Sequence, residues 1–346
     1  MKKVLKKLGK VILYFLMFLI LLSSFVLVSR RINQNKIDKI LAYGSNPKAE
    51  EVYKPSPKNI SVQKRRFKEG NISGFHHIPS EIRHKGLVIT FSGSDGGIYE
   101  NISNYLSSDG YELLAVKYFG GEGQPKQGES IALELYESIY SYIEANCKNI
   151  DTITLVGASK GAQLALLLAA HYESVDNLVL VAPTAHVWSH NPLDGEKSGF
   201  WTYKGEELEY LNGEKSGVAV IKTLTNLLLN KPHDQLVFAN SEFENSTNLE
   251  EARIKVENSD AKILAFYGED DRMLDAKTGA ELIKKHASNE VIIHGYKNTG
   301  HALGAESIMN TEIGGLRLNG GNFDSNIEAD LDMKKITLEV LEKWHQ

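Results

Sequence analysis

The stretch TLVGASKGAQLALLLAA, Thr154–Ala170, joins two apolar runs through a serine that has a glycine two positions before it and another two positions after it. The first run is typical of a buried strand and the second of a helix. Between a strand and a helix, Gly157-x-Ser159-x-Gly161 favours a sharp turn that presents the serine hydroxyl, because small flanking residues let the two elements pack closely. The alternative is an ordinary strand-to-helix turn with a serine near the cap.

The rest of the chain supplies the context for this turn. Short apolar runs, rich in β-branched and aromatic residues, occupy residues 86–93, 111–119, 151–157, 177–183, 262–270 and 291–296. Such continuous hydrophobicity is typical of strands that are buried on both faces of a parallel sheet. Helical patterns lie at residues 128–146, 160–172 and 275–287. We therefore expect a doubly wound, mostly parallel α/β sheet with helices on both faces, preceded by a hairpin over residues 60–67 and 72–79.

The N-terminus predicts a membrane anchor. Residues 11–29 carry no charge, and a helix of that length spans about 28 Å, close to the thickness of a bilayer core. We divide the chain into an anchor over residues 1–31, a polar linker over 32–59 and a catalytic domain over 60–346. A cleaved signal peptide is the alternative. Five lysines before the span favour a cytoplasmic N-terminus and an extracytoplasmic body. Four Lys or Arg soon after the span weaken this charge asymmetry.

Charge and cysteine content exclude several classes of function. Residues 1–40 carry nine Lys or Arg and one Asp, a net charge of +8. Because the net charge of the whole chain is −5, residues 41–346 carry −13. An acidic body is a poor nucleic-acid binder. The lone Cys147 allows no intramolecular disulfide and no thiolate metal cluster. His76 and His77 are neighbours on an expected strand and point to opposite faces, so we expect neither a metal nor a cofactor.

A serine hydroxyl needs a base before it can act as a nucleophile. His301 follows the run at 291–296 and is expected at the same edge of the sheet as Ser159, whereas His286 lies in a helical pattern and His294 within a strand. We therefore assign His301 as the general base. Its acid partner is expected in the loop after residues 262–268, with Asp271 preferred.

Two neighbouring carboxylates remain alternatives for the acid, and the oxyanion donors must also be assigned. Asp270 is the second choice for the acid and Asp275 the third. One donor is the backbone N–H of Lys160, directly after the nucleophile, and the other is expected from Ser94, or less firmly Asp95, in the loop SGSDGG at 92–97. That loop lacks the lysine and the spacing of a phosphate-binding P-loop.

The interval between Pro183 and Lys262 breaks the alternation of strands and helices. It contains one clear helical pattern, at residues 217–230, together with several aromatic residues, among them Trp188, Phe200 and Trp201. Aromatic side chains seek burial, which argues against a disordered insertion. We interpret residues 184–261 as a cap over the site.

Four segments together resemble one known family: LVGASKGAQLALLLAA, GEDDRML, YKNTGHAL and the stretch FSGSDGGIYENISNYLSSDGYELLAVKYF. They are similar to the C-terminal catalytic domain of acyl-CoA thioesterases and bile acid-CoA:amino acid N-acyltransferases, from Gly86 to the C-terminus. The resemblance implies the α/β-hydrolase superfamily and matches Ser159, Asp271 and His301 residue by residue. Where the N-acyltransferases carry a cysteine nucleophile this chain has Ser159, which implies hydrolysis.

The resulting hypothesis is a serine hydrolase that cleaves a small-molecule acyl thioester or ester through an acyl-enzyme, and that reaches the membrane through its N-terminal helix. If the leaving group were coenzyme A, its phosphates would need cations, for which Lys160, Lys204 and Lys222 are candidates. The alternatives are a peptidase or carboxylesterase of the same fold, and a catalytically inactive binding module.

Overall fold

The computed structural model describes residues 2–43, 47–148, 150–189, 197–301, 303, 308–312 and 315–346. Its centre is an eight-stranded sheet in the order β1-β2-β4-β3-β6-β7-β10-β11. These strands are β1 Val62–Glu69, β2 Ile72–Pro79, β3 Gly86–Phe91, β4 Glu112–Lys117, β6 Thr152–Ala158, β7 Asn177–Val181, β10 Lys262–Gly268 and β11 Val291–Tyr296.

The strand directions agree with the sequence pattern. β1 and β2 form an antiparallel hairpin, and β2 joins β4 antiparallel. All other neighbours in the sheet are parallel. The six predicted strands and the hairpin are therefore confirmed, and the parallel strands carry their C-terminal ends to one edge.

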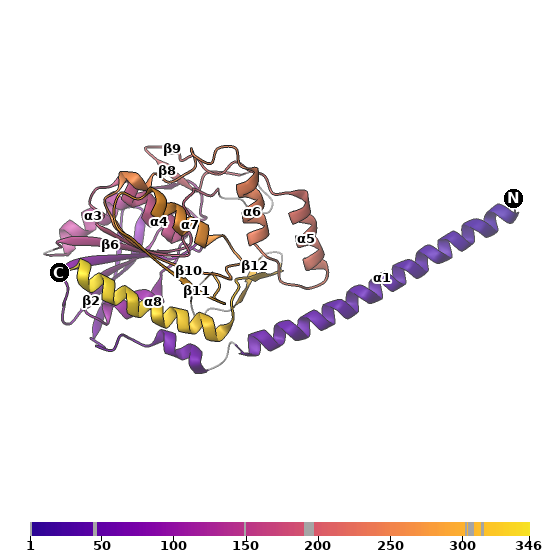
Figure 1. The fold of residues 1–346 in the computed structure, drawn as a ribbon, viewed down its shortest axis with the longest axis horizontal. Helices are drawn as coiled ribbons and strands as arrows, with labels where there is room; N and C mark the ends of the chain where they lie inside the picture. Colours follow the sequence, from indigo (N-terminus) through magenta and orange to yellow (C-terminus); the bar gives the residue numbers. More distant parts are fainter. Residues whose placement is uncertain are drawn as a thin grey trace.

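Helices cover both faces of the sheet (Figure 1). One core joins inward side chains such as Leu87 and Ile89 to three helices, α3 Leu135–Asn146, α4 Lys160–His171 and α7 Ala276–His286. The other core joins Val88 and Val156 to α2 Glu100–Ser107 and α8 Phe323–Trp344. Nine of the twelve residues of α4 are buried, so the helix that follows Ser159 is fixed firmly in the protein interior.

The interval between β7 and β10 holds more regular structure than its sequence pattern indicates. Its elements are β8 Trp201–Tyr203, β9 Glu206–Glu207, α5 Gly217–Leu228, α6 Leu236–Asn245 and η2 Val256–Asn258. A second small hairpin, β12 Met309–Glu312 and β13 Gly315–Leu318, follows β11.

The helix predicted over residues 128–146 starts later than its pattern indicates. Ile131 and Ala132 form the short strand β5, which pairs with β8, and α3 begins only at Leu135. Ser130 adopts a positive φ of 49°, and the Ile131 N–H donates to the carbonyl of Phe200. A right-handed helix cannot run through a residue with this φ, and the backbone beyond it pairs instead with the segment between β7 and β10.

The N-terminal helix α1 runs from Lys2 to Tyr43 and projects from the body (Figure 1). Within the described part of the chain it is the one helix long and apolar enough to cross a membrane. It continues into residues 32–43, where the sequence indicated a polar tether, and η1 Pro47–Tyr53 follows. Ile37 is 2% exposed, so this end of α1 packs on the body.

Candidate active site

Ser159 lies at the junction of β6 and α4 in a strained backbone conformation. Its φ of 53° and ψ of −116° are unusual for a residue with a side chain. A Cβ on Gly157 would come within 2.2 Å of the Gly161 carbonyl oxygen, and one on Gly161 within 2.2 Å of the Ser92 oxygen. Both positions therefore require glycine, for the packing reason that the sequence suggested.

The loop after β3 packs directly against this turn. A Cβ on Gly93 would lie 3.6 Å from Cβ of Ser159. The buried Tyr118 hydroxyl contacts the carbonyl oxygens of Ser92, at 3.2 Å, and Gly93, at 2.5 Å. Ser94, the expected oxyanion donor, lines the same cavity as Ser159 and Lys160. The loop is therefore held beside the first turn of α4, where helical N–H groups point outward.

Asp271 and His301 meet at the C-terminal edge of the sheet. Asp271 follows β10 and His301 follows β11, and Nδ1 of His301 lies 2.7 Å from Oδ2 of Asp271. The other carboxylate oxygen accepts hydrogen bonds from the N–H groups of Met273, at 2.7 Å, and Leu274, at 3.1 Å. Asp271 is 6% exposed, so its orientation is fixed. His301 lines the cavity that Ser159 also lines.

The two alternative acids have other partners. Asp270 accepts hydrogen bonds from Arg272 Nη2, at 2.5 Å, and from the N–H of Gly321, at 3.0 Å. Asp275 caps α7 by accepting from the N–H and the hydroxyl of Thr278. The geometry thus brings Asp271, and neither of its neighbours, to His301.

The segment Asn319–Gly321 connects the acid loop to the histidine loop, which the sequence analysis missed. The carbonyl oxygen of Asn319 accepts from the N–H groups of His301, at 2.9 Å, and Arg272, at 3.3 Å. Gly320 has a φ of +93°, and a Cβ there would lie 1.8 Å from the Asp270 carbonyl oxygen. The Gly320-Gly321 pair in the sequence was the available signal, because paired glycines mark tight backbone approaches.

The cavity has a volume of about 350 Å³, and residues of the interval between β7 and β10 form much of its wall. Trp201 is fully buried and donates from Nε1 to Oε1 of Gln163 on α4, at 2.6 Å. Lys160 Nζ donates to the carbonyl oxygen of Trp188, at 2.8 Å, and lies 4.3 Å from the Phe200 ring centre. These contacts attach the interval to α4, the helix that begins directly after Ser159.

Among the described residues that line the cavity, the Lys and Arg side chains are Lys160, Lys215 and Arg317. Burial lowers the pKa of Lys160 to about 7, although the Glu242 carboxylate opposes this shift. Burial also lowers the pKa of Lys215, and it lowers that of Arg317 to about 10. Glu242 is the one acid among the described lining residues and lies 3.0 Å from Lys197 Nζ.

Of the three cations that the sequence suggested for phosphate binding, Lys160 lines the cavity. Lys204 lies over the Tyr203 ring in the turn between β8 and β9, and Lys222 is exposed on α5. Lys215 and Arg317 take their place in the lining, and no pattern in the sequence singled them out.

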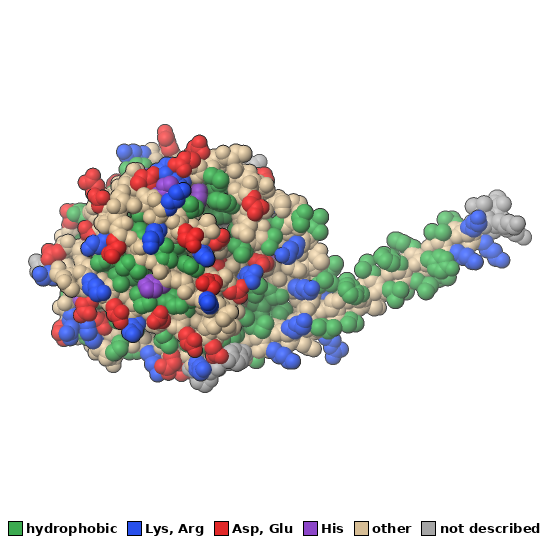
Figure 2. Space-filling model, in the orientation of Figure 1, with side chains coloured by type: hydrophobic (Ala, Val, Ile, Leu, Met, Phe, Trp, Pro, Cys, Tyr) green, Lys and Arg blue, Asp and Glu red, His purple; other side chains and the backbone are tan. Residues whose placement is uncertain are grey.

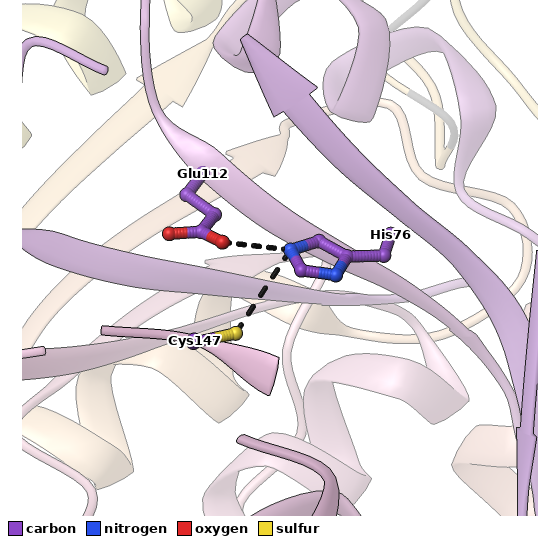
Figure 3. Close-up of side chains that lie close together, drawn as sticks. All are labelled: His76, Glu112 and Cys147. Carbon is purple, nitrogen blue, oxygen red and sulfur yellow. Dashed lines mark hydrogen bonds and ion pairs between the residues drawn. The ribbon is translucent and has the colours of Figure 1, made fainter. Parts of the chain in front are cut away.

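A second cluster of polar side chains lies near the start of β4 (Figure 3). His76 Nε2 is 2.8 Å from Oε1 of Glu112 and 3.9 Å from Sγ of Cys147, and the three ligand atoms lie within 4.8 Å of one another. Arg65 Nη2 approaches His76 Nδ1 at 3.1 Å. Burial and the Glu112 carboxylate raise the pKa of Cys147 to about 12. A metal cation at this cluster would lie close to the Arg65 guanidinium, and this like-charge contact disfavours binding.

The two adjacent histidines point to opposite faces of the sheet, as the sequence indicated. His76 Nδ1 lies 3.3 Å from the hydroxyl of Tyr142 on α3, whereas His77 Nδ1 lies 3.0 Å from that of Ser107 on α2. They cannot share one ligand.

Comparison with known families gives one match across this site. The family is described as BAAT / Acyl-CoA thioester hydrolase C terminal, and the match covers residues 131–332. The matched segment contains Ser159, Asp271 and His301.

The names of two curated relatives correspond to this family description. The chain is 25% identical over 247 residues to mouse acyl-coenzyme A amino acid N-acyltransferase 2, covering 70% of this chain and 54% of that protein. It is 24% identical over 252 residues to human acyl-coenzyme A thioesterase 1, covering 69% and 54%. The chain thus spans about half the length of the curated relatives it matches.

Among solved structures, an esterase from Pyrobaculum calidifontis superposes with a TM-score of 0.52 at 14% identity. The superposition covers 92% of this chain and 94% of the esterase. This likeness concerns the fold alone, and it confirms the predicted α/β-hydrolase fold.

Proposed function

The chain belongs to the BAAT / Acyl-CoA thioester hydrolase C-terminal family, and on that premise we propose that it is a serine hydrolase of acyl thioesters or esters. The observation that carries the proposal is the arrangement at the C-terminal edge of the sheet. There the strained turn at Ser159 and the Asp271–His301 pair, 2.7 Å apart, border one cavity.

The reaction would proceed in two halves. In the first, Ser159 Oγ attacks the acyl carbonyl carbon while His301 Nε2 takes the hydroxyl proton, and Asp271 holds Nδ1–H and stabilises the imidazolium. The carbonyl oxygen becomes an oxyanion that accepts hydrogen bonds from the N–H groups of Lys160 and Ser94. His301 then gives this proton to the sulfur or oxygen of the leaving group, which departs as a thiol or alcohol and leaves the acyl-enzyme. In the second half, neutral His301 takes a proton from water as the water oxygen attacks the acyl carbon; the carboxylic acid is released, and the proton on His301 returns to Ser159 Oγ.

The basic lining indicates a substrate that carries negative charge. Lys160, Lys215 and Arg317 all border the cavity, and an anionic group near them would offset the cost of their burial. Coenzyme A has such groups. A peptidase that anchors a substrate amine would need a carboxylate, and Glu242, the one acid among the described lining residues, is paired with Lys197.

The proposed location follows from α1. The lysines before residues 11–29 and the length of the apolar run support a single span with the N-terminus in the cytoplasm and the body outside it. Access to cytoplasmic acyl-CoA depends on this orientation. With the body outside, simple acyl esters and thioesters are the expected substrates; with the body inside, acyl-CoA is.

The test is a substrate panel with the full chain in nanodiscs. An acyl-CoA, the p-nitrophenyl ester of the same acid and a peptide amide are compared by kcat/KM. We expect thioester and ester hydrolysis with negligible amide cleavage, and a loss on the order of 10⁴-fold or more in Ser159→Ala. Dominant amide cleavage, or a Ser159→Ala variant of undiminished activity, would overturn the proposal.

A further inference from the structure

Helix α5 turns its apolar residues outward. The exposed fractions of Val218, Ile221, Leu224 and Leu228 are 78, 66, 60 and 55%. On the side toward the body, Ala219 is buried and Thr223 and Asn226 are half-buried. A helix on the surface of a water-soluble domain shows the reverse pattern, with its apolar stripe facing the core.

The C-terminal end of α5 is bound to α1. Arg30 Nη1 donates to the carbonyl oxygens of Leu227 and Leu228, at 3.1 and 3.0 Å, and Asn33 Nδ2 donates to that of Leu229, at 2.8 Å. These bonds satisfy carbonyls that the end of a helix leaves without intrahelical partners. They hold α5 beside one particular turn of α1 (Figure 1).

That turn is where the apolar span ends. Arg30 is the first charged residue after the uncharged run at 11–29. With this run in the hydrocarbon core, Arg30 and the end of α5 lie at the level of the lipid headgroups. Figure 2 shows hydrophobic side chains along α1 and on the neighbouring edge of the body, where α5 lies in Figure 1.

We propose that α5 is a second membrane contact, resting in the interface of the bilayer that α1 enters, with its apolar face toward the acyl chains. Exposed basic residues surround the junction, namely Arg30, Arg31, Lys36, Lys222 and Lys231. Their charge fits a surface that contains anionic lipid. Twelve residues of helix give a contact about 18 Å long.

The contact brings the candidate site to the bilayer. Lys215, which lines the cavity, directly precedes Ser216, whose hydroxyl caps α5. α6, which packs beside α5, contributes Ala239 and Glu242 to the cavity wall. Resting on the proposed hydrolase function, this placement assigns the substrate class: acyl esters or thioesters whose acyl chains are dissolved in the membrane.

Spin labels on the full chain test the contact directly. Cys147 is replaced by serine, and single cysteines are placed at Leu224 on α5 and at Ile82, which is 50% exposed near the start of β3. In vesicles of phosphatidylcholine with phosphatidylglycerol, the label at 224 should collide with oxygen more than with a water-soluble nickel chelate, and the label at 82 the reverse. Equal nickel access at both positions, or spin–spin broadening at 224 from a second copy of the chain, would overturn the contact.

Kinetics test the consequence separately. Ile221→Ser/Leu224→Ser should lower hydrolysis of a vesicle-borne ester by about tenfold, since two apolar anchors are lost. It should leave a soluble p-nitrophenyl ester within about twofold, and Ile82→Ser should change neither rate. Loss on both substrates would contradict the membrane role of α5. Absence of any ester hydrolysis in the wild-type chain would instead refute the proposed function, and the spin-label result would still decide the contact.

Discussion

The candidate site and the cluster at the start of β4 each combine an acid, a histidine and a side chain capable of nucleophilic attack. Asp271, His301 and Ser159 gather at the C-terminal edge of the parallel strands around a cavity. The second cluster, Glu112, His76 and Cys147, lies near the opposite edge, where β4 begins. The residue types are similar, but the two histidines meet their partners through different ring nitrogens, and this decides whether a proton can be transferred.

The difference is which ring nitrogen each histidine uses. His301 presents Nδ1 to Asp271, so Nε2 remains for a proton from the nucleophile. His76 turns the same atom, Nε2, to both Glu112 and Cys147 (Figure 3). A proton cannot be relayed from thiol to acid across that ring, and the thiol stays neutral. An acid, a histidine and a nucleophilic side chain close together therefore indicate catalysis only when the partner of each histidine ring nitrogen is known.

The largest contrast is expected between the two histidines. His301→Gln should lower kcat for a p-nitrophenyl ester on the order of 10⁴-fold, because the proposed general base is lost. His76→Gln should leave kcat within a few-fold and cost about 1–3 kcal/mol of unfolding free energy, because a buried partner of Glu112 is lost. Ester kinetics and thermal unfolding of both variants measure this. Equal losses of kcat would end the distinction between the clusters.

A smaller contrast is expected between the neighbouring acids. Asp271→Asn should lower kcat by about 10³- to 10⁴-fold, since the amide favours the wrong tautomer of His301. Asp270→Asn removes a partner of Arg272 and Gly321 and should lower kcat by less than about tenfold. Steady-state kinetics of the two variants check the assignment. A larger loss in Asp270→Asn than in Asp271→Asn would assign the acid to Asp270.

The thiol of the second cluster offers a test of its own, because burial and the Glu112 carboxylate raise its pKa. The Cys147 pKa of about 12 leaves very little thiolate at pH 8, so its alkylation should be about 10³-fold slower than that of a free thiol. The rate should rise up to about pH 12 and become fast in urea. Iodoacetamide labelling followed by mass spectrometry measures it. Rapid labelling of the folded chain at pH 8 would show that the thiol is activated.

The smallest effect concerns Lys160, whose pKa is lowered to about 7. The ammonium is charged below that pH and loses its charge as the pH rises through it. KM for an acyl-CoA should therefore increase by about two- to threefold between pH 6 and 8, beyond any change for a neutral ester. Lys160→Met should remove this extra dependence, and an unchanged profile in that variant would mean that Lys160 does not meet the substrate's charge.

Local pattern was sufficient to predict the strands and the turn at Ser159, because a strand, a glycine-bracketed serine and a helix are consecutive in the chain. Asp271 and His301 could be brought to one edge for a similar reason, since parallel strands end together. The Gly320-Gly321 pair marks a close backbone approach, but the sequence does not show that the partners of Asn319–Gly321 are the loops at Arg272 and His301, because these contacts are tertiary.

Other features depend on tertiary contacts that no local pattern encodes. The start of α3 at Leu135 follows from pairing between β5 and β8. Lys215 and Arg317 could not be distinguished from surface cations, because burial and not residue type sets their environment. The apolar pattern of α5 indicated a helix correctly, but which face it exposes depends on α1 and α6.

The central claim is that Ser159 is the activated nucleophile of the chain. The most direct measurement is reaction of the full chain with a fluorophosphonate, followed by intact-mass analysis and peptide mapping. The account predicts one adduct per chain, located on Ser159, and no adduct in the Ser159→Ala or His301→Gln variants. An unmodified wild-type chain, an adduct on another residue, or labelling that persists in Ser159→Ala would contradict it.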